Sequence, residues 1–184
     1  MGVVDMPRQF FLQSVVLPLF ERIGALWRLG KLKTINEHMA SVVVRAILWD
    51  MLRSVHISET APKIVVATPV GHWHELGALA SALAASESGW RVFYFGPNLP
   101  AEEIAYATKK LNVKALALSL CHQLDDNRLG AELKKIRRLI GNDLSIFIGG
   151  PGTESVRKTI LQIRAVSGID LGGFRDELEA LARV

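Results

Sequence analysis

The sequence of 184 residues contains a single cysteine, which excludes an intramolecular disulfide. One reduced thiol, Cys121, is typical of a protein of the reducing cytoplasm. A membrane-spanning run is also missing, because the apolar stretch 13–20 is short and is interrupted by Pro18. The N-terminus has no secretory pattern. We therefore expect a soluble, cytoplasmic protein that does not enter a membrane.

The sequence also lacks a large net charge and clusters of metal-binding residues. The formal net charge is only +4, and the densest basic run, 134–138, lies on a predicted helix, where it is expected to face solvent. No cluster of cysteine and histidine has the spacing of a zinc site. A histidine that binds a metal would therefore need its other ligands from a cofactor. The apolar content of 49% indicates a folded globular protein.

The first sixty residues are predicted to be helical. Apolar residues recur at helical spacing over 8–29, and Gly30 ends this stretch. A second helix is expected from Thr34, where Thr34 and Glu37 have the spacing of a capping box. Two helices cannot bury both of their apolar stripes against each other. Residues 1–60 are thus interpreted as a partial helical bundle, the helical cap, which is completed by the following domain, by further helices or by a second chain.

Residues 63–184 alternate between strands and helices. Short apolar strands that are separated by helices indicate a parallel sheet covered on both faces, so an α/β domain of the Rossmann-like or flavodoxin-like type is expected. The predicted strands are 63–68, 91–95, 114–119, 144–148 and a weak fifth near 165–166. The predicted helices are 75–88, 101–111, 126–140, one from Glu154 and one from Gly173.

Polar or small residues follow three of these strands. His74 follows the first strand and is the strongest candidate for a metal ligand, although a lone histidine is more often structural. Ser119 ends the third strand, where it can bind a ligand or cap a turn. Gly149 and Gly150 follow the fourth strand, where they allow a ligand to approach or form a tight turn. Carboxyl ends of parallel strands share one edge of the sheet, so these residues are expected to converge.

In this order the residues resemble the Asp-x-His-x-x-Gly, Ser-x-Leu and Gly-Gly signature of cobalamin-binding domains. The segment Tyr94-Phe95-Gly96 followed by Pro100 also matches that family. The resemblance implies that His74 ligates cobalt from below, and that the displaced dimethylbenzimidazole tail of the cofactor runs into the sheet. By the same resemblance the cofactor is expected to contact His72, Trp73, Glu75, Leu76, Gly77, Gly96, Ser119, Leu120, Cys121, Gly149, Gly150 and Pro151.

Two positions depart from this signature. His72 stands where the family has an aspartate, so the carboxylate that usually orients the ligating imidazole is missing. Cys121 stands where a leucine is usual.

Trp27, Glu37 and His38 form a Trp-x9-Glu-His pattern that resembles the signature of the CarH/LitR-type light-dependent regulators. In that family the tryptophan packs at the upper face of the corrin, the glutamate contacts the adenosyl group, and the histidine can ligate cobalt after photolysis. Taken singly, the three residues are also explained as a core aromatic, a capping residue and a polar residue of a first helical turn. The resemblance covers the chain from about Leu17.

The resemblance implies a cobalamin-binding sensor rather than an enzyme. We expect it to respond to light through adenosylcobalamin, although methylcobalamin or hydroxocobalamin are other possible forms of the cofactor. Signalling is expected through the position of the helical cap and through a homo-oligomer or a protein partner, because the chain has no DNA-binding segment. The alternative is a corrinoid carrier for methyl transfer. A third interpretation is an α/β interaction module without a cofactor.

Overall fold

The computed structural model describes residues 7–121 and 128–183, and within this part the chain divides into two compact units. The first unit ends at Val55 and the second begins at His56. We refer to them as the helical unit and the sheet unit. Among the described residues, no helix combines the length and the apolar character needed to cross a bilayer.

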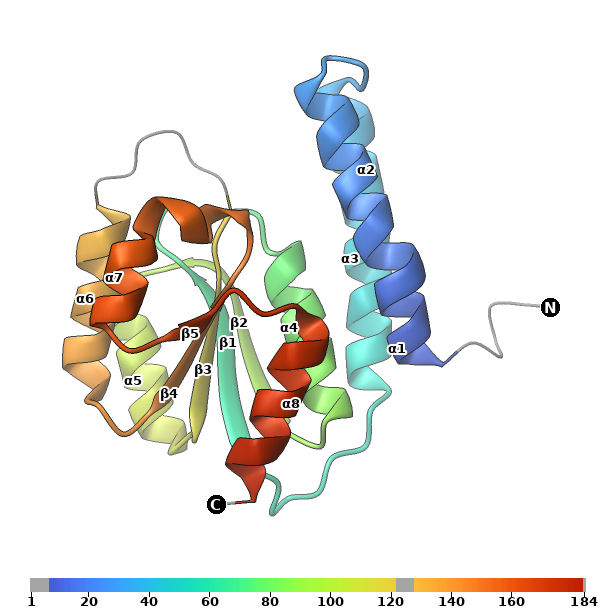
Figure 1. The fold of residues 1–184 in the computed structure, drawn as a ribbon. Helices are drawn as coiled ribbons and strands as arrows, with labels where there is room; N and C mark the ends of the chain where they lie inside the picture. Colours follow the sequence, from blue (N-terminus) through green and yellow to red (C-terminus); the bar gives the residue numbers. More distant parts are fainter. Residues whose placement is uncertain (1–6, 122–127, 184) are drawn as a thin grey trace. The chain divides into compact units, whose positions relative to one another are not determined.

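The helical unit is a pair of helices joined by a tight turn (Figure 1). Its first arm consists of α1 (Arg8–Phe11), a π-helical turn (Leu12–Val16) and α2 (Leu17–Arg28), which confirms the helix predicted over 8–29. In the π turn the Leu17 N–H bonds to the carbonyl of Leu12, five residues back. Pro18 has no N–H to continue the ordinary helical bonding at this point, and the rare π-helix occurs mostly as a single turn of this kind inside an α-helix.

Gly30 ends the first arm, as predicted. It has a φ of +67°, a conformation that glycine adopts without strain. The Gly30 N–H bonds to the Trp27 carbonyl, and the Lys31 N–H bonds to the Leu26 carbonyl. These two bonds form the Schellman arrangement that satisfies the last carbonyls of a helix.

The second arm is α3 (Thr34–Arg53). The predicted capping box at its start is wrong. The residue before the helix is Lys33, no side chain caps the first turn, and Thr34 is already helical. The Glu37 carboxylate bonds forward to the Ser41 hydroxyl at 2.7 Å instead of reaching back to the helix start.

The sheet unit contains a five-stranded parallel sheet with strand order β2-β1-β3-β4-β5, which confirms the predicted fold class. The strands are β1 (Lys63–Pro69), β2 (Arg91–Leu99), β3 (Ala115–Ser119), β4 (Ser145–Gly149) and β5 (Val166–Ser167). The helices are α4 (Leu76–Glu87), α5 (Ala101–Leu111), α6 (Leu129–Ile140), the 3-10 turn Pro151–Val156 with α7 (Arg157–Gln162), and α8 (Leu171–Ala182).

Three of these helices start two or more residues from the predicted position. The helix predicted from Glu154 is a 3-10 turn from Pro151 and becomes α-helical at Arg157. Residues 126 and 127, which were predicted to open the helix over 126–140, lie outside the described residues. The last helix begins at Leu171 rather than at Gly173, because the Asp170 carboxylate accepts the Gly173 N–H at 2.8 Å and so caps the helix.

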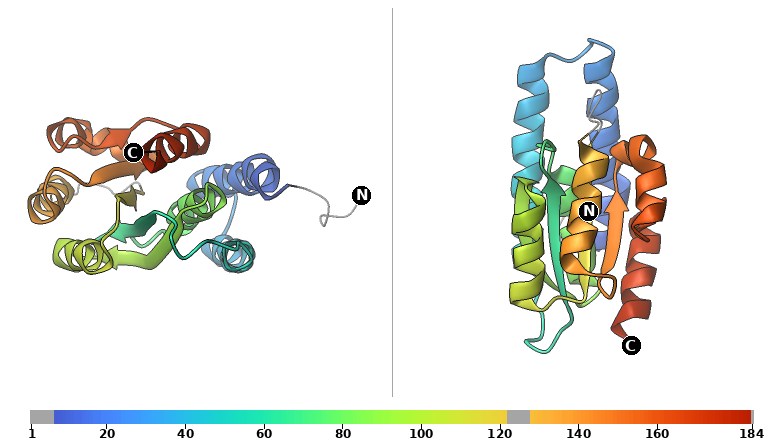
Figure 2. Two further views of the ribbon diagram at one scale, coloured as in Figure 1. Left: turned by 90° about the horizontal axis from the view of Figure 1, so that it is seen from below. Right: turned by 90° about the vertical axis from the view of Figure 1, so that its left-hand side faces the viewer.

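Helices cover both faces of the sheet (Figures 1 and 2). Helices α5, α6 and α7 pack on the face to which β1 contributes Val65 and β3 contributes Leu116 and Leu118. Helices α4 and α8 cover the other face, where the rings of Phe147 and Phe174 meet edge to face with centroids 5.2 Å apart. Helices cover both faces of the sheet, which leaves the ends of the strands for polar residues. The predicted site residues of this unit lie at the carboxyl-terminal ends.

Candidate functional site

The predicted site residues of the sheet unit gather at the carboxyl-terminal edge of the sheet. The pairing of β3 with β4 places Ser119 opposite Gly149. The pairing of β1 with β3 places Ala67 opposite Leu118, so the loop that follows β1 begins at the same edge. The expected convergence of strand ends is therefore present, and the loop 70–75, Ser119 and the glycine pair are its parts.

His74 lies in the loop between β1 and α4 with an exposed side chain. Within the described part of the chain, its imidazole makes no hydrogen bond. The neighbouring Trp73 is also exposed, at 67%. In the described ranges, no group of three or more His, Cys, Asp or Glu side chains is arranged to hold a metal ion. The His74 side chain is thus exposed to solvent and offers a single imidazole nitrogen as a metal ligand.

His72, two residues earlier, is fully buried. Its N–H bonds to the Pro69 carbonyl at 3.1 Å, and its own carbonyl accepts the Asn98 N–H at 3.1 Å and the Thr68 hydroxyl. Its ring Nδ1 accepts the backbone N–H of Cys121 at 3.1 Å. The residue that replaces the expected aspartate therefore ties the loop after β1 to the end of β3.

Thr68 and Asn98 also support this loop, although neither was predicted from the sequence as a site residue. The Asn98 carboxamide oxygen accepts the Gly71 N–H at 2.7 Å, and the Asn98 N–H also lies 2.9 Å from the Thr68 hydroxyl oxygen. Asn98 has a φ of +62°, which asparagine tolerates better than most residues. The sequence signal for this turn was the Gly-Pro-Asn segment that follows the aromatic part of β2.

Glu75 points toward β2, where its Oε2 accepts the Tyr94 hydroxyl at 2.6 Å. A Cβ atom on Gly96 would lie 3.8 Å from the same carboxylate oxygen. This bond fixes the end of the loop just before α4, since Glu75 immediately precedes Leu76, the first residue of that helix.

Cys121 lies directly after the buried Leu120, at the end of β3. Its Sγ is 3.3 Å from His72 Nδ1. Burial raises the pKa of the Cys121 thiol, and hydrogen bonds from the backbone of His74, of Cys121 itself and of Trp73 oppose this rise. Through His72, the thiol therefore contacts the loop that carries His74.

The glycines of the site differ in the space around them. A Cβ on Gly77 would come within 2.6 Å of the Ser119 hydroxyl oxygen, and a Cβ on Gly150 would collide with the Leu120 carbonyl. A Cβ on Gly149, in contrast, would meet nothing within 4 Å. Pro151 follows as the first residue of the 3-10 turn. The strand ends are thus tightly packed except at Gly149, where there is open space.

The Ser119 side chain is largely buried, at 9% exposure, and no hydrogen bond of its hydroxyl is found among the described residues. This hydroxyl is therefore available to bond to a ligand or to water. Ser119 lies opposite Gly149 in the sheet, so the open space and this hydroxyl belong to the same edge.

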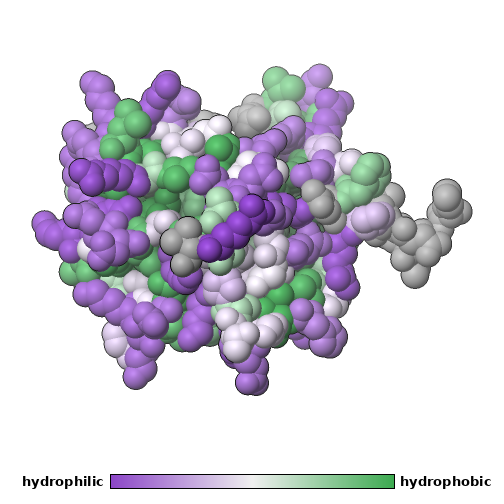
Figure 3. All heavy atoms as spheres, turned by 60° about the horizontal axis from the view of Figure 1, so that its bottom comes forward, coloured by the Kyte–Doolittle hydropathy of each residue, from purple (hydrophilic) through white to green (hydrophobic). Residues whose placement is uncertain are grey.

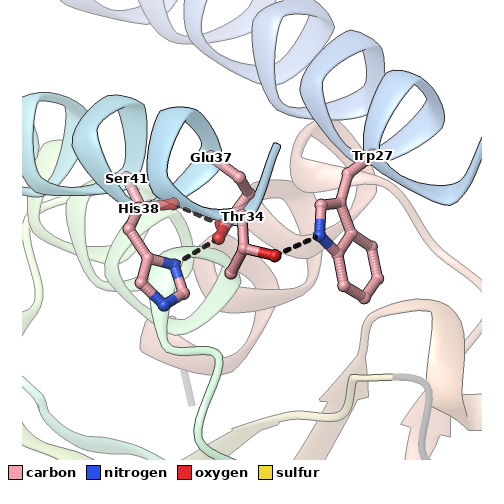
Figure 4. Close-up of polar contacts among 5 residues, drawn as sticks. All are labelled: Trp27, Thr34, Glu37, His38 and Ser41. Atoms are coloured by element: carbon pink, nitrogen blue, oxygen red, sulfur yellow. Dashed lines mark hydrogen bonds and ion pairs between the residues drawn. The ribbon is translucent and has the colours of Figure 1, made fainter. Parts of the chain in front are cut away.

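In the helical unit, the predicted residues Trp27, Glu37 and His38 form one polar cluster with Thr34 and Ser41 (Figure 4). The Trp27 Nε1–H donates to the Thr34 hydroxyl at 3.4 Å, and His38 Nδ1 lies 2.6 Å from Glu37 Oε2. The Trp27 indole and the His38 ring project to the same side of the helix pair, and both side chains are exposed. Glu37 is held from two sides, by His38 and by Ser41.

A hollow of about 420 Å³ lies at the opposite, amino-terminal end of the strands. It is lined by residues that include Lys114, Leu144 and Leu181. Figure 3 shows this end of the molecule, where hydrophilic side chains are interspersed with small hydrophobic patches. None of the predicted site residues lines this hollow, so it is separate from the candidate site.

A family model described as the B12 binding domain matches residues 62–183. The chain is 28% identical over 142 residues to the HTH-type transcriptional repressor CarH of Myxococcus xanthus, an alignment that covers 77% of this chain and 47% of that protein. It is 24% identical over 155 residues to the HTH-type transcriptional repressor CarA of the same organism, which covers 84% and 52%. The chain thus spans about half the length of these two relatives. Both are described as repressors, in agreement with the expectation that the chain is not an enzyme.

Among solved structures, the monomethylamine corrinoid protein of Methanosarcina barkeri is similar with a TM-score of 0.74 at 11% identity. The match covers 97% of this chain and 85% of that one, and it supports the fold assignment.

Proposed function

Because the chain belongs to the B12-binding domain family, we propose that it is a light-responsive cobalamin sensor in which His74 is the lower ligand of cobalt. The binding of cobalamin is inferred from membership of this family. The choice of His74 rests on its position, since among the described residues it is the exposed imidazole at the carboxyl-terminal edge of the sheet and has no competing hydrogen bond.

The residues at this edge fit the lower side of the cofactor. Gly149 leaves open space at the end of β4, and the Ser119 hydroxyl beside it has a free bonding capacity. A nucleotide tail is polar and needs both room and hydrogen-bond partners. We propose that the tail of cobalamin enters between these two residues, and that Gly77 and Gly150 are glycines because the neighbouring strand ends leave no space for a side chain.

The Trp27, Glu37 and His38 cluster supports a role at the upper side of the cofactor. When bound, adenosylcobalamin would supply a cobalt–carbon bond that light can break. Glu37 holds His38 through Nδ1, which leaves His38 Nε2 as the donor for cobalt, in the manner in which carboxylates orient metal-binding histidines. We propose that Trp27 and Glu37 contact the adenosyl group, and that His38 becomes the upper ligand after illumination.

The output is proposed to be a change of oligomeric state or of a protein contact. The repressors CarH and CarA share this stretch of sequence, so the chain is proposed to serve transcription regulation as the sensing part. The element that switches between two states would be the helical unit, because the residues proposed for the upper side of the cofactor all lie on α2 and α3.

The test is reconstitution of the purified chain with adenosylcobalamin in the dark. Absorption spectra and size-exclusion profiles are then compared before and after green light. We expect His74→Ala to weaken uptake of the cofactor, and His38→Ala to bind in the dark but to change the illuminated spectrum. His56→Ala, at another exposed histidine, is the matched control and is expected to behave as wild type. Identical spectra and profiles in darkness and light would rule out the sensor.

A corrinoid carrier for methyl transfer is the second candidate, because the structure of a corrinoid protein shares this fold. A carrier needs an upper face that partner enzymes can reach, so Trp27 and His38 would then be incidental. Binding of methylcobalamin as tightly as adenosylcobalamin, together with an unchanged illuminated spectrum in His38→Ala, would favour the carrier over the sensor.

A further inference from the structure

The two positions that depart from the family signature contact each other. His72 replaces the expected aspartate and Cys121 replaces the expected leucine, and they are 49 residues apart in the chain. In the structure Cys121 Sγ lies 3.3 Å from His72 Nδ1, and the Cys121 N–H donates to the same nitrogen at 3.1 Å. Because Nδ1 accepts the backbone N–H, the thiol is the donor in the second contact.

The contact with His72 joins Cys121 to the segment that carries His74. His72 lies two residues before His74 in the loop between β1 and α4, so the Sγ–Nδ1 contact and the bond from the Cys121 N–H both act on this loop.

The far side of the loop is fixed by His72. Its carbonyl accepts the Asn98 N–H and the Thr68 hydroxyl, and its ring is fully buried. A rotation of this buried ring would break the bond to the Cys121 N–H. The backbone of the loop is thus held from β1 and β2 through His72, and from β3 through Cys121.

We propose that Cys121, paired with His72, is the positioning residue that orients His74 toward cobalt. This inference rests on the proposed role of His74 as the lower ligand. An aspartate at position 72 would act on the imidazole itself, whereas this pair acts on the backbone on which the imidazole stands. A leucine at position 121 would keep the backbone N–H bond to His72 but would have no side-chain polar group for Nδ1, so the side-chain contact is what the two replacements add together.

The test uses the full chain loaded with cobalamin that has been reduced to its divalent cobalt state. Electron paramagnetic resonance then reports whether a nitrogen ligates the metal from below. Protein labelled with histidine that carries the heavy nitrogen isotope distinguishes an imidazole of the protein from the base of the cofactor. His74→Ala supplies the reference spectrum without the protein ligand.

Cys121→Ser keeps a donor and acceptor at this position and is expected to retain the imidazole signal. Cys121→Val removes both, and we expect the imidazole signal to fall and the affinity for cobalamin to drop by about tenfold to 100-fold, as is typical when the support of a metal ligand is lost. Cys121→Ala removes the same bonds with a smaller side chain and serves if the valine variant does not fold. His72→Asn is expected to give a loss similar to that of Cys121→Ala, and the double variant is expected to lose little more, because the pair acts as a unit.

The outcomes are distinguishable. If Cys121→Val or Cys121→Ala keeps the full imidazole signal, the positioning role is wrong, even where the apo protein melts at a lower temperature. If losses at His72 and Cys121 simply add, the pair does not act as a unit and the inference also fails. If wild type binds no cobalamin, or binds it without an imidazole signal, the proposed role of His74 itself is wrong and the inference falls with it.

Discussion

The backbone of Gly77 lies against the side chain of Ser119, so closely that a Cβ atom at position 77 would be 2.6 Å from the serine hydroxyl oxygen. Gly77 is the second residue of α4, and Ser119 is the last residue of β3. This contact joins the helix that follows the His74 loop to the strand end at which the cofactor tail is proposed to lie.

Replacement of Gly77 is therefore expected to be unfavourable. Alanine normally stabilises a helix by about 1 kcal/mol relative to glycine, but Gly77→Ala is expected to lower the free energy of unfolding by about 1–3 kcal/mol through overpacking. Ser119→Ala removes the clashing oxygen and should restore stability in the double variant, since the serine Cβ would remain 3.8 Å away. Urea denaturation of the two single variants and the double variant measures this, and failure of the rescue would contradict the contact.

The glycine pair after β4 should show opposite effects. Gly150 has a φ of +95° and no room beside the Leu120 carbonyl, so Gly150→Ala is expected to destabilise the fold by about 2 kcal/mol or more. Gly149→Ala meets open space and should change stability by less than about 0.5 kcal/mol. The same Gly149 variant is expected to bind cobalamin less tightly, because its methyl group would occupy space proposed for the tail. Equal binding by wild type and Gly149→Ala in equilibrium titrations would place the tail elsewhere.

The bond between Tyr94 and Glu75 is expected to stabilise the loop before α4. Tyr94→Phe removes a hydrogen bond to a carboxylate and should cost about 1.5 kcal/mol of stability. Tyr106→Phe is the matched control, because Tyr106 is 64% exposed and should change stability by less than about 0.5 kcal/mol. Thermal unfolding of both variants measures the difference. Equal stabilities would show that the bond contributes little.

Cys121 is expected to be a slow nucleophile. Burial raises the pKa of its thiol, so the reactive thiolate is a smaller fraction at neutral and mildly alkaline pH than in an unfolded chain. Alkylation by iodoacetamide should therefore be slower in the folded protein than in urea, and the rate for the folded protein should begin to rise only at a higher pH than the rate in urea. Equal rates across the pH range in both states would contradict the burial of the thiol.

Most of the fold could be predicted from the sequence because its signals are local. Runs of β-branched and apolar residues predicted all five strands, although β2 continues to Leu99, past Gly96 where it was expected to end, and Gly30 predicted the end of the first helical arm. The prediction of a capping box at the start of α3 was wrong, also for a local reason. Glu37 has a partner in Ser41, one helical turn ahead, and Thr34 accepts from Trp27, so neither side chain is used at the helix start.

The site was predictable only in part. The strand ends could be placed at one edge because parallel strands require it, and the register of Ser119 with Gly149 agrees with that expectation. The contact between His72 and Cys121 was not predictable, since each replacement is unremarkable alone and 49 residues separate them. Asn98 and Thr68 were missed for a similar reason, because their bonds to the loop depend on the turn at the end of β2.

The open space at Gly149 also offers an attachment point for a reporter group. A cysteine at position 149 would project where no neighbouring atom lies within 4 Å, so it should accept a small environment-sensitive dye with little disturbance of the fold. In a Cys121→Ser background this would be the only thiol of the chain. Because the dye would occupy the space proposed for the cofactor tail, corrinoid would have to displace it, and the resulting change in fluorescence would report competition for this space.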